Sequence, residues 1–99
     1  MRLMMPVVLP DINEETEKRD GTGTGEWVVI VYNNDHNTYP EVIGILMRAT
    51  GCHRQEAEIE AWEIDILGRS VVHHATETEC NRVASVIRTI GIQVEVREE

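Results

Sequence analysis

The chain has 99 residues, and its 18 acidic and 9 basic side chains give a formal net charge of −9. This length predicts one small domain, and the negative charge argues against binding to a nucleic-acid backbone, which requires a basic patch. Two cysteines do not make a disulfide framework, and no apolar run reaches the length of a membrane span. We therefore expect a monomeric cytoplasmic protein without a nucleic-acid or membrane partner.

The first 25 residues differ in composition from the rest of the chain. Residues 11–20 are polar and charged without an apolar period, and residues 21–25 form a joint of alternating Gly and Thr. A segment of this composition lacks the apolar side chains needed for a core. We predict a disordered extension over residues 1–25 and a folded domain over residues 26–99.

The folded part is predicted to begin with a buried strand. Trp27–Tyr32 is an unbroken run of apolar, β-branched and aromatic residues, which is typical of a strand covered on both faces. The six polar residues Asn33–Thr38 then predict a turn rich in hydrogen-bonding groups. Thr38 and Glu41 have capping-box spacing, and the apolar period that follows predicts a helix over Tyr39–Thr50. Such a turn either carries a recognition site or only connects the strand to the helix.

The next segment carries conflicting signals. Glu56–Ala61 alternates apolar and polar residues as a strand does, but Glu and Ala are strong helix formers. The length of the segment, the helical face shared by Ala57, Ala61 and Ile64, and Gly68 as a stop favour a helix over about Arg54–Leu67. We expect a solvated acidic face on this helix, formed by Glu56, Glu60 and Glu63.

Two strands and a helix are predicted in the C-terminal part. Ser70–His74 indicates a short strand, and the capping-box spacing that begins at Thr76 predicts a helix over about Glu77–Ile90. Residues 92–96 alternate as a half-buried final strand does. The element order β-α-α-β-α-β predicts an α+β fold, a single small domain with a three-stranded antiparallel sheet packed against three helices.

The residue types of metal and catalytic sites are present without the required spacing. Cys52, His53 and Cys80 lack zinc-site spacing, and the neighbours His73 and His74 would point to opposite faces of a strand. No glycine-rich phosphate-binding motif occurs, and no nucleophile has a recognisable base. We predict no metal, no cofactor and no catalytic residue.

The polar turn is the remaining candidate site. It supplies several acceptors and the carboxylate of Asp35, and Asp65 stands between two isoleucines of the second helix, where Asp is mediocre. If that helix packs beside the turn, the two carboxylates face a cation together, and an ammonium group with apolar surroundings would suit them. The alternative is an Asp65 side chain that points into solvent.

The stretch from Val28 to Leu46, VVIVYNNDHNTYPEVIGIL, resembles the Clp protease adaptor family, ClpS. Members of this family carry a strand, an Asn-Asp-Asp turn and a helix with paired aliphatic residues. The resemblance extends from Glu26 to about Val96, with a Gly after the second helix and a Thr-capped third helix. It implies a non-catalytic adaptor that binds the free N-terminus of proteins with a bulky hydrophobic first residue, called an N-degron. The adaptor would deliver these proteins to a Clp AAA+ unfoldase of the ClpA or ClpC type.

The resemblance also implies roles for individual residues. The α-amino group of the N-degron would be held by Asn33, Asn34, Asp35 and Asp65. The hydrophobic pocket for the first side chain would be formed by Val31, Asn37, Tyr39, Val42, Ala61 and Ile64. The unfoldase would dock on Thr76, Glu77, Glu79 and Arg82.

This chain departs from the family pattern at four of these positions. Asn34 replaces an Asp, Asp65 replaces a His, and Tyr39 and Ala61 replace methionines. The Asp65 carboxylate preserves an acceptor, and a charge-assisted bond to an ammonium group is stronger than a neutral one. Ala61 is smaller than methionine and leaves more room in the pocket, which would relax strict selectivity for Leu, Phe, Tyr or Trp as the first residue. Two alternatives remain: a ClpS-like interaction module that binds no N-degron, and a small metal- or ligand-binding domain.

Overall fold

The computed structural model describes residues 26–99 of the chain. The elements follow in the order β1 (Trp27–Tyr32), α1 (Tyr39–Thr50), α2 (Arg54–Leu67), β2 (Arg69–Ala75), α3 (Glu77–Arg88) and β3 (Val94–Glu98). The predicted α+β class and the predicted element order are confirmed. The expected disorder of residues 1–25 lies outside the described residues.

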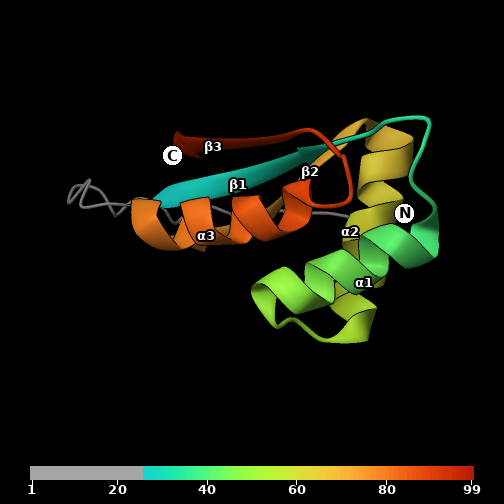
Figure 1. Cartoon of the computed structure of the whole chain (residues 1–99), viewed down its shortest axis with the longest axis horizontal. Helices are drawn as coiled ribbons and strands as arrows, with labels where there is room; N and C mark the ends of the chain where they lie inside the picture. The colour runs from blue at the N-terminus through green and yellow to red at the C-terminus, as the bar shows by residue number, and fades with distance from the viewer. Residues whose placement is uncertain (1–25) are drawn as a thin grey trace, which may run out of the picture.

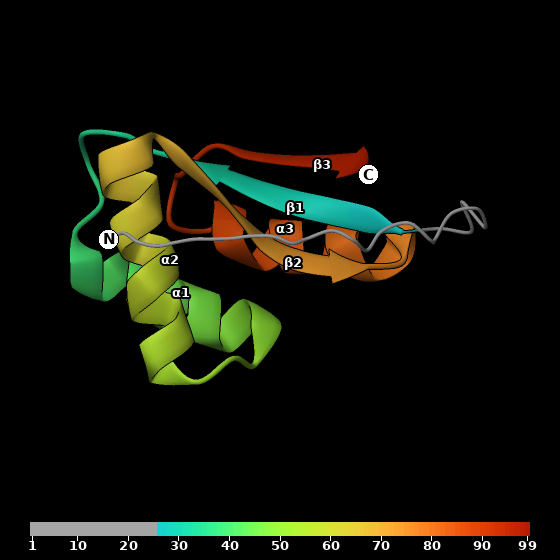
Figure 2. The ribbon, with the colours of Figure 1, turned by 180° about the vertical axis from the view of Figure 1, so that it is seen from behind.

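The sheet has the order β2-β1-β3, and both neighbours run antiparallel to the central strand β1. The α3 helix lies along one face of the sheet, while α1 and α2 pack together toward the end where β1 finishes (Figures 1 and 2). Pairing with β2 shifts register between Val29 and Ile30, which marks a bulge. The polar turn after β1 therefore emerges beside both α1 and α2.

The core forms between the sheet and the helices. Val29 and Val31 of β1 pack with Leu46 of α1 and with Val83 and Ile87 of α3, and all five are fully buried. Val28 and Ile30 alternate with them toward the other face of the sheet, and they are also buried. The prediction of a strand buried on both faces is confirmed.

The C-terminal boundaries differ from the prediction. Helix α3 ends at Arg88 rather than Ile90, because the chain turns at Thr89, whose hydroxyl donates to the carbonyl of Val86, and continues to Gly91 at φ 82°. This turn delays β3 until residue 94. Ile92 is buried but lies before the strand, so its place in the alternating pattern reflects packing rather than sheet pairing.

The acidic face of α2 was predicted wrongly at Glu60, and Glu63 is only partly exposed, with Oε1 accepting from the Ser70 hydroxyl at 2.7 Å. Glu60 is only 8% exposed, and its Oε1 atom has no hydrogen-bond partner among the described residues. The buried side of α2 comprises Ala57, Glu60, Ala61 and Ile64, which is broader than the alternation of the sequence indicates. Burial, with the nearby charge of Glu56 as the next cause, raises the pKa of Glu60 to about 8.

Candidate functional site

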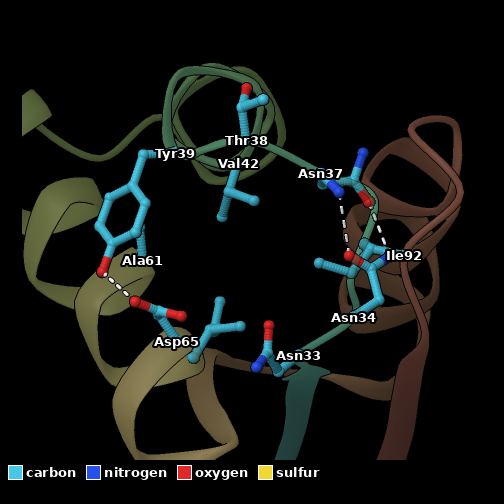
Figure 3. Close-up of a pocket in the computed structure, with 10 residues that line it drawn as sticks. Asn33, Asn34, Asn37, Thr38, Tyr39, Val42, Ala61, Asp65 and Ile92 are labelled. Carbon is cyan, nitrogen blue, oxygen red and sulfur yellow. Dashed lines mark hydrogen bonds between the residues drawn. The ribbon is translucent and has the colours of Figure 1, made fainter.

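A pocket of about 130 Å³ lies between the end of β1, the first turn of α1, the C-terminal half of α2 and the segment before β3. Figure 3 shows the side chains that surround it. An engineered cavity of about 150 Å³ accommodates benzene, so this pocket has the scale of one aromatic ring. Its lining residues are Asn33, Asn34, Asn37, Thr38, Tyr39, Val42, Ala61, Ile64, Asp65 and Ile92.

The loop that borders the pocket is held by its own side chains. Asn34 Oδ1 accepts from the backbone N–H groups of His36 and Asn37, each at 3.1 Å, and its Nδ2 donates to Asn37 Oδ1 at 2.8 Å. Asn37 Nδ2 donates to the carbonyl of Ile90 at 2.9 Å, which ties the loop to the turn after α3. Asn34 and Asn37 therefore fix the shape of the loop with the atoms that would otherwise be offered to a ligand.

The start of α1 is fixed by the predicted capping box. Thr38 Oγ1 accepts from the backbone N–H of Glu41 at 3.3 Å, and Glu41 Oε1 accepts from the backbone N–H of Thr38 at 3.0 Å. Hydrogen bonding, chiefly from the Thr38 backbone, lowers the pKa of Glu41. The cap sets the position of Tyr39 and Val42, which both face the pocket.

Two polar side chains remain directed into the pocket, Asn33 and Asp65 (Figure 3). The Asn33 backbone N–H donates to the carbonyl of Gly68 at 2.9 Å, which joins the end of β1 to the end of α2. The Asn33 side chain makes no hydrogen bond within residues 26–99. Asp65 Oδ2 accepts from the Tyr39 hydroxyl at 2.8 Å, and its Oδ1 has no such partner in the same range. An amide and a carboxylate oxygen thus face one small space.

The remaining lining is apolar. Val42, Ala61, Ile64 and Ile92 are each less than 10% exposed and form the deeper surface of the pocket. Ile92 and Thr38 were missing from the residues predicted to line it. The capping signal at Thr38 was visible in the sequence, whereas Ile92 was assigned to a strand, where no signal connected it with this pocket.

Two predicted site residues lie elsewhere. Asp35 is exposed and does not line the pocket, although it belongs to the bordering loop. Val31 is fully buried in the core behind it. The roles of both in ligand binding stay predictions, and the two carboxylates Asp35 and Asp65 do not flank the pocket together.

The predicted docking residues cluster at the start of α3. Thr76 Oγ1 accepts from the backbone N–H of Glu79 at 3.2 Å and caps the helix. Arg82 donates to Glu79 at 2.7 Å and to the carbonyl of Ala49 at 3.0 Å, which links α3 to the end of α1. The Arg82 guanidinium holds the pKa of Glu79 near 2. Glu77 is exposed and makes no such contact within the described range.

Neither a metal-binding cluster nor a helix that could cross a membrane occurs in residues 26–99. No group of three or more His, Cys, Asp or Glu side chains in this range gathers as a metal site would require. Cys80 is buried, and burial raises the pKa of its thiol, which opposes thiolate chemistry. No helix in the same range is long and apolar enough to cross a membrane.

The sequence matches the family model of the ATP-dependent Clp protease adaptor protein ClpS over residues 23–94. It is 27% identical over 74 residues to the E3 ubiquitin-protein ligase ubr-1 of Caenorhabditis elegans, a stretch that covers 75% of this chain and 4% of that protein. The fold is similar to that of Agrobacterium tumefaciens ClpS2, solved bound to L-phenylalaninamide. That match has a TM-score of 0.71 and 14% identity, and it covers 76% of this chain and 98% of the other.

Proposed function

Because the chain belongs to the ClpS family, we propose that it binds the free N-terminus of proteins with a bulky hydrophobic first residue and delivers them to a Clp AAA+ unfoldase. The observation that supports this proposal is a single pocket that combines polar acceptors with an apolar lining. Asn33 and Asp65 offer acceptors for an ammonium group, and buried aliphatic side chains offer a space of about 130 Å³ for a side chain. A first residue presents these two groups on the same Cα atom.

The roles of the polar groups follow from their charge and from the hydrogen bonds that they already make. Asp65 supplies the negative charge for the ammonium group, and Asn33 supplies a neutral acceptor that fixes its direction. Asn34 and Asn37 support the site from the loop because their own hydrogen bonds already engage them. The phenylalaninamide bound by ClpS2 presents a free amine and an aromatic side chain, the pair of groups proposed for the ligand of this chain.

A fluorescence-anisotropy titration with labelled peptides tests binding. A Phe-led peptide with a free N-terminus should bind, and its acetylated and Gly-led counterparts should not. Asp65→Ala should weaken binding by about 1.5–3 kcal/mol, the scale for a hydrogen bond to a charged group, and Asp65→Asn should weaken it less. Equal binding of the free and acetylated peptides would contradict the proposal.

Delivery requires a second surface, which we place at the start of α3 around Thr76, Glu77, Glu79 and Arg82. Glu77 is the best residue to change, because its exposed side chain holds no other element in place. Glu77→Arg should lower the degradation of an N-degron reporter by a reconstituted Clp protease without changing peptide affinity. Ser85→Arg, at an exposed position on the same helix, is the matched control. Equal loss of delivery in both variants would contradict this placement.

A further inference from the structure

Tyr39 and Asp65 meet across one side of the pocket, although they belong to different helices. Tyr39 is the first residue of α1, and Asp65 lies in the last turn of α2. The Tyr39 hydroxyl donates to Asp65 Oδ2 at 2.8 Å, and the ring closes the side of the pocket away from Asn37 and Ile92 (Figure 3). This bond joins the two helices at the edge of the proposed binding site.

The bond leaves the carboxylate able to serve a ligand. A carboxylate has two oxygens with about four acceptor positions in total, and the tyrosine occupies a position on Oδ2. The other oxygen stays available to an ammonium group. The hydrogen bond to Asp65 raises the pKa of Tyr39, so the phenol remains a protonated donor across the neutral range.

The bond also restricts the tyrosine. Tyr39 is 42% exposed, and an exposed side chain without a partner would sample several rotamers. Bonding at its far end holds the ring against the pocket. Among the described residues that line the pocket, Tyr39 alone has an aromatic ring, and the apolar side chains are Val42, Ala61, Ile64 and Ile92. A fixed aromatic wall favours a flat aromatic guest, because aromatic pairs gain energy beyond their buried area.

We propose that Tyr39 is a specificity-determining residue whose ring, held by Asp65, makes the pocket prefer aromatic first residues to leucine. This inference rests on the proposed binding of N-termini. Asp65 then has two roles, since it receives the ammonium group of the ligand and positions the ring that contacts the side chain.

Ionisation of the phenol tests the Tyr39–Asp65 bond without any ligand. Ultraviolet absorbance titration of the wild type reports both tyrosines, and Y39F leaves only Tyr32, so the difference isolates Tyr39. We expect D65N to lower the pKa of Tyr39 toward its ordinary value. Glu95→Gln is the matched control, because Glu95 accepts from Tyr32 instead and should leave Tyr39 unchanged. The same Tyr39 pKa in wild type and D65N would overturn the inference.

Selectivity tests the role of the ring, with two peptides that differ only in a first Phe or Leu. The wild type should favour Phe by roughly two- to tenfold, the range of aromatic-pair energies. Y39L should abolish this preference, and Y39F should reduce it because the ring stays but is no longer held. D65N should weaken both peptides while keeping most of the ratio, since an Asn oxygen still accepts from the phenol.

These measurements can refute the role of Tyr39 without refuting the proposed binding of N-termini. If the wild type binds free but not acetylated peptides, while Y39L and Y39F keep the wild-type ratio, the inference fails and the proposed function stands. If the wild type binds neither the free nor the acetylated peptides, the role of Tyr39 and the proposed function both fail. Tyr39 is exposed, so its variants are expected to keep the fold, which circular dichroism checks.

Discussion

Helices α1 and α2 both line the pocket, but their residues suit a helix to different degrees. In α1, Thr38 and Glu41 form a complete capping box, Pro40 stands in the first turn, and Gly51 closes the helix at φ 76°. In α2, the N-cap residue His53 makes no side-chain capping bond, and the last turn has no basic residue. The first helix satisfies the rules of helix termini at both ends, whereas the second closes at Gly68 with φ 94° but lacks a side-chain bond at its N-cap.

The same contrast holds along the two helix surfaces. The buried residues of α1 are all apolar, whereas the buried side of α2 includes Glu60 with an unpartnered oxygen. Helix α2 also exposes large apolar residues, namely Ile59, Trp62, Ile66 and Leu67. Departures from local consistency are expected to collect where function constrains a sequence. We therefore expect α1 to carry stability, and α2 to tolerate or even gain from substitution.

The largest effect should come from the core of α1. Leu46 is fully buried, so Leu46→Ala removes apolar contacts and leaves a cavity. We expect a loss of about 2–5 kcal/mol in the free energy of unfolding, measured by urea denaturation. The matched control on the same helix is Arg48→Ala, at an exposed position, which should change stability by less than about 0.5 kcal/mol. Similar losses in the two variants would mean that α1 does not anchor the core.

Glu60 should produce the next largest effect, and it should depend on pH. Its pKa is about 8 in the folded protein, against 4.5 for the unperturbed carboxyl group. Between these values the unfolded chain has released the proton and the folded chain keeps it. Stability therefore falls as pH rises from about 4.5 to about 8, with a slope of at most ~1.4 kcal/mol per unit, and levels off above.

Two variants isolate the contribution of this carboxyl group to stability. Glu60→Gln should flatten the pH dependence of stability, because an amide side chain does not ionise in this pH range. Glu60→Leu should raise stability at pH 8 by about 1–3 kcal/mol, the penalty of a buried unsatisfied polar group. Urea denaturation at several pH values measures both. A Glu60→Gln profile parallel to that of the wild type would show that Glu60 ionises normally in the fold.

Glu60 also shows what the sequence left undetermined. Periodicity located α1, and helix propensity, length and the stop at Gly68 located α2, both with the bounds that the structure has, because these signals lie within each helix. The width of a buried face depends instead on what packs against it. Helical spacing places Glu60 on the same face as Ala57, Ala61 and Ile64, but a charged residue type indicates an exposed position, and only the packing shows that its side chain is covered.

The site was likewise predictable where it depends on local sequence, and not where it depends on contacts between distant elements. The position of the polar turn and most of the pocket lining followed from the sequence and the family resemblance. The hydrogen bond from Asn37 to the carbonyl of Ile90 did not, because Ile90 is 53 residues away. The contact of Tyr39 with Asp65 also depends on how two helices cross. Pairings between distant elements therefore separate the predicted site from the observed one.

The cap of α1 should give a smaller effect. Thr38→Ala removes the side chain that accepts from the backbone N–H of Glu41. We expect a loss of about 1 kcal/mol in unfolding free energy, within the usual range for capping residues. Thr38→Ser keeps the hydroxyl and should stay close to the wild type. Denaturant titration of the three proteins decides, and an unchanged stability in Thr38→Ala would show that other contacts hold the start of α1.

The cap of α2 should give the smallest effect, with the opposite sign. His53 has the extended backbone of an N-cap residue, φ −71° and ψ 157°, and its carbonyl already accepts from the Ala57 N–H at 3.1 Å. Only the side-chain bond is missing, so His53→Ser supplies an acceptor without adding to the charge of −9. We expect a gain of about 0.5–1 kcal/mol. His53→Ala, which offers no acceptor, is the matched control and should not gain. A Ser variant no more stable than the Ala variant would mean that α2 is not limited by its cap, and that its departures from a regular helix lie wholly along its faces.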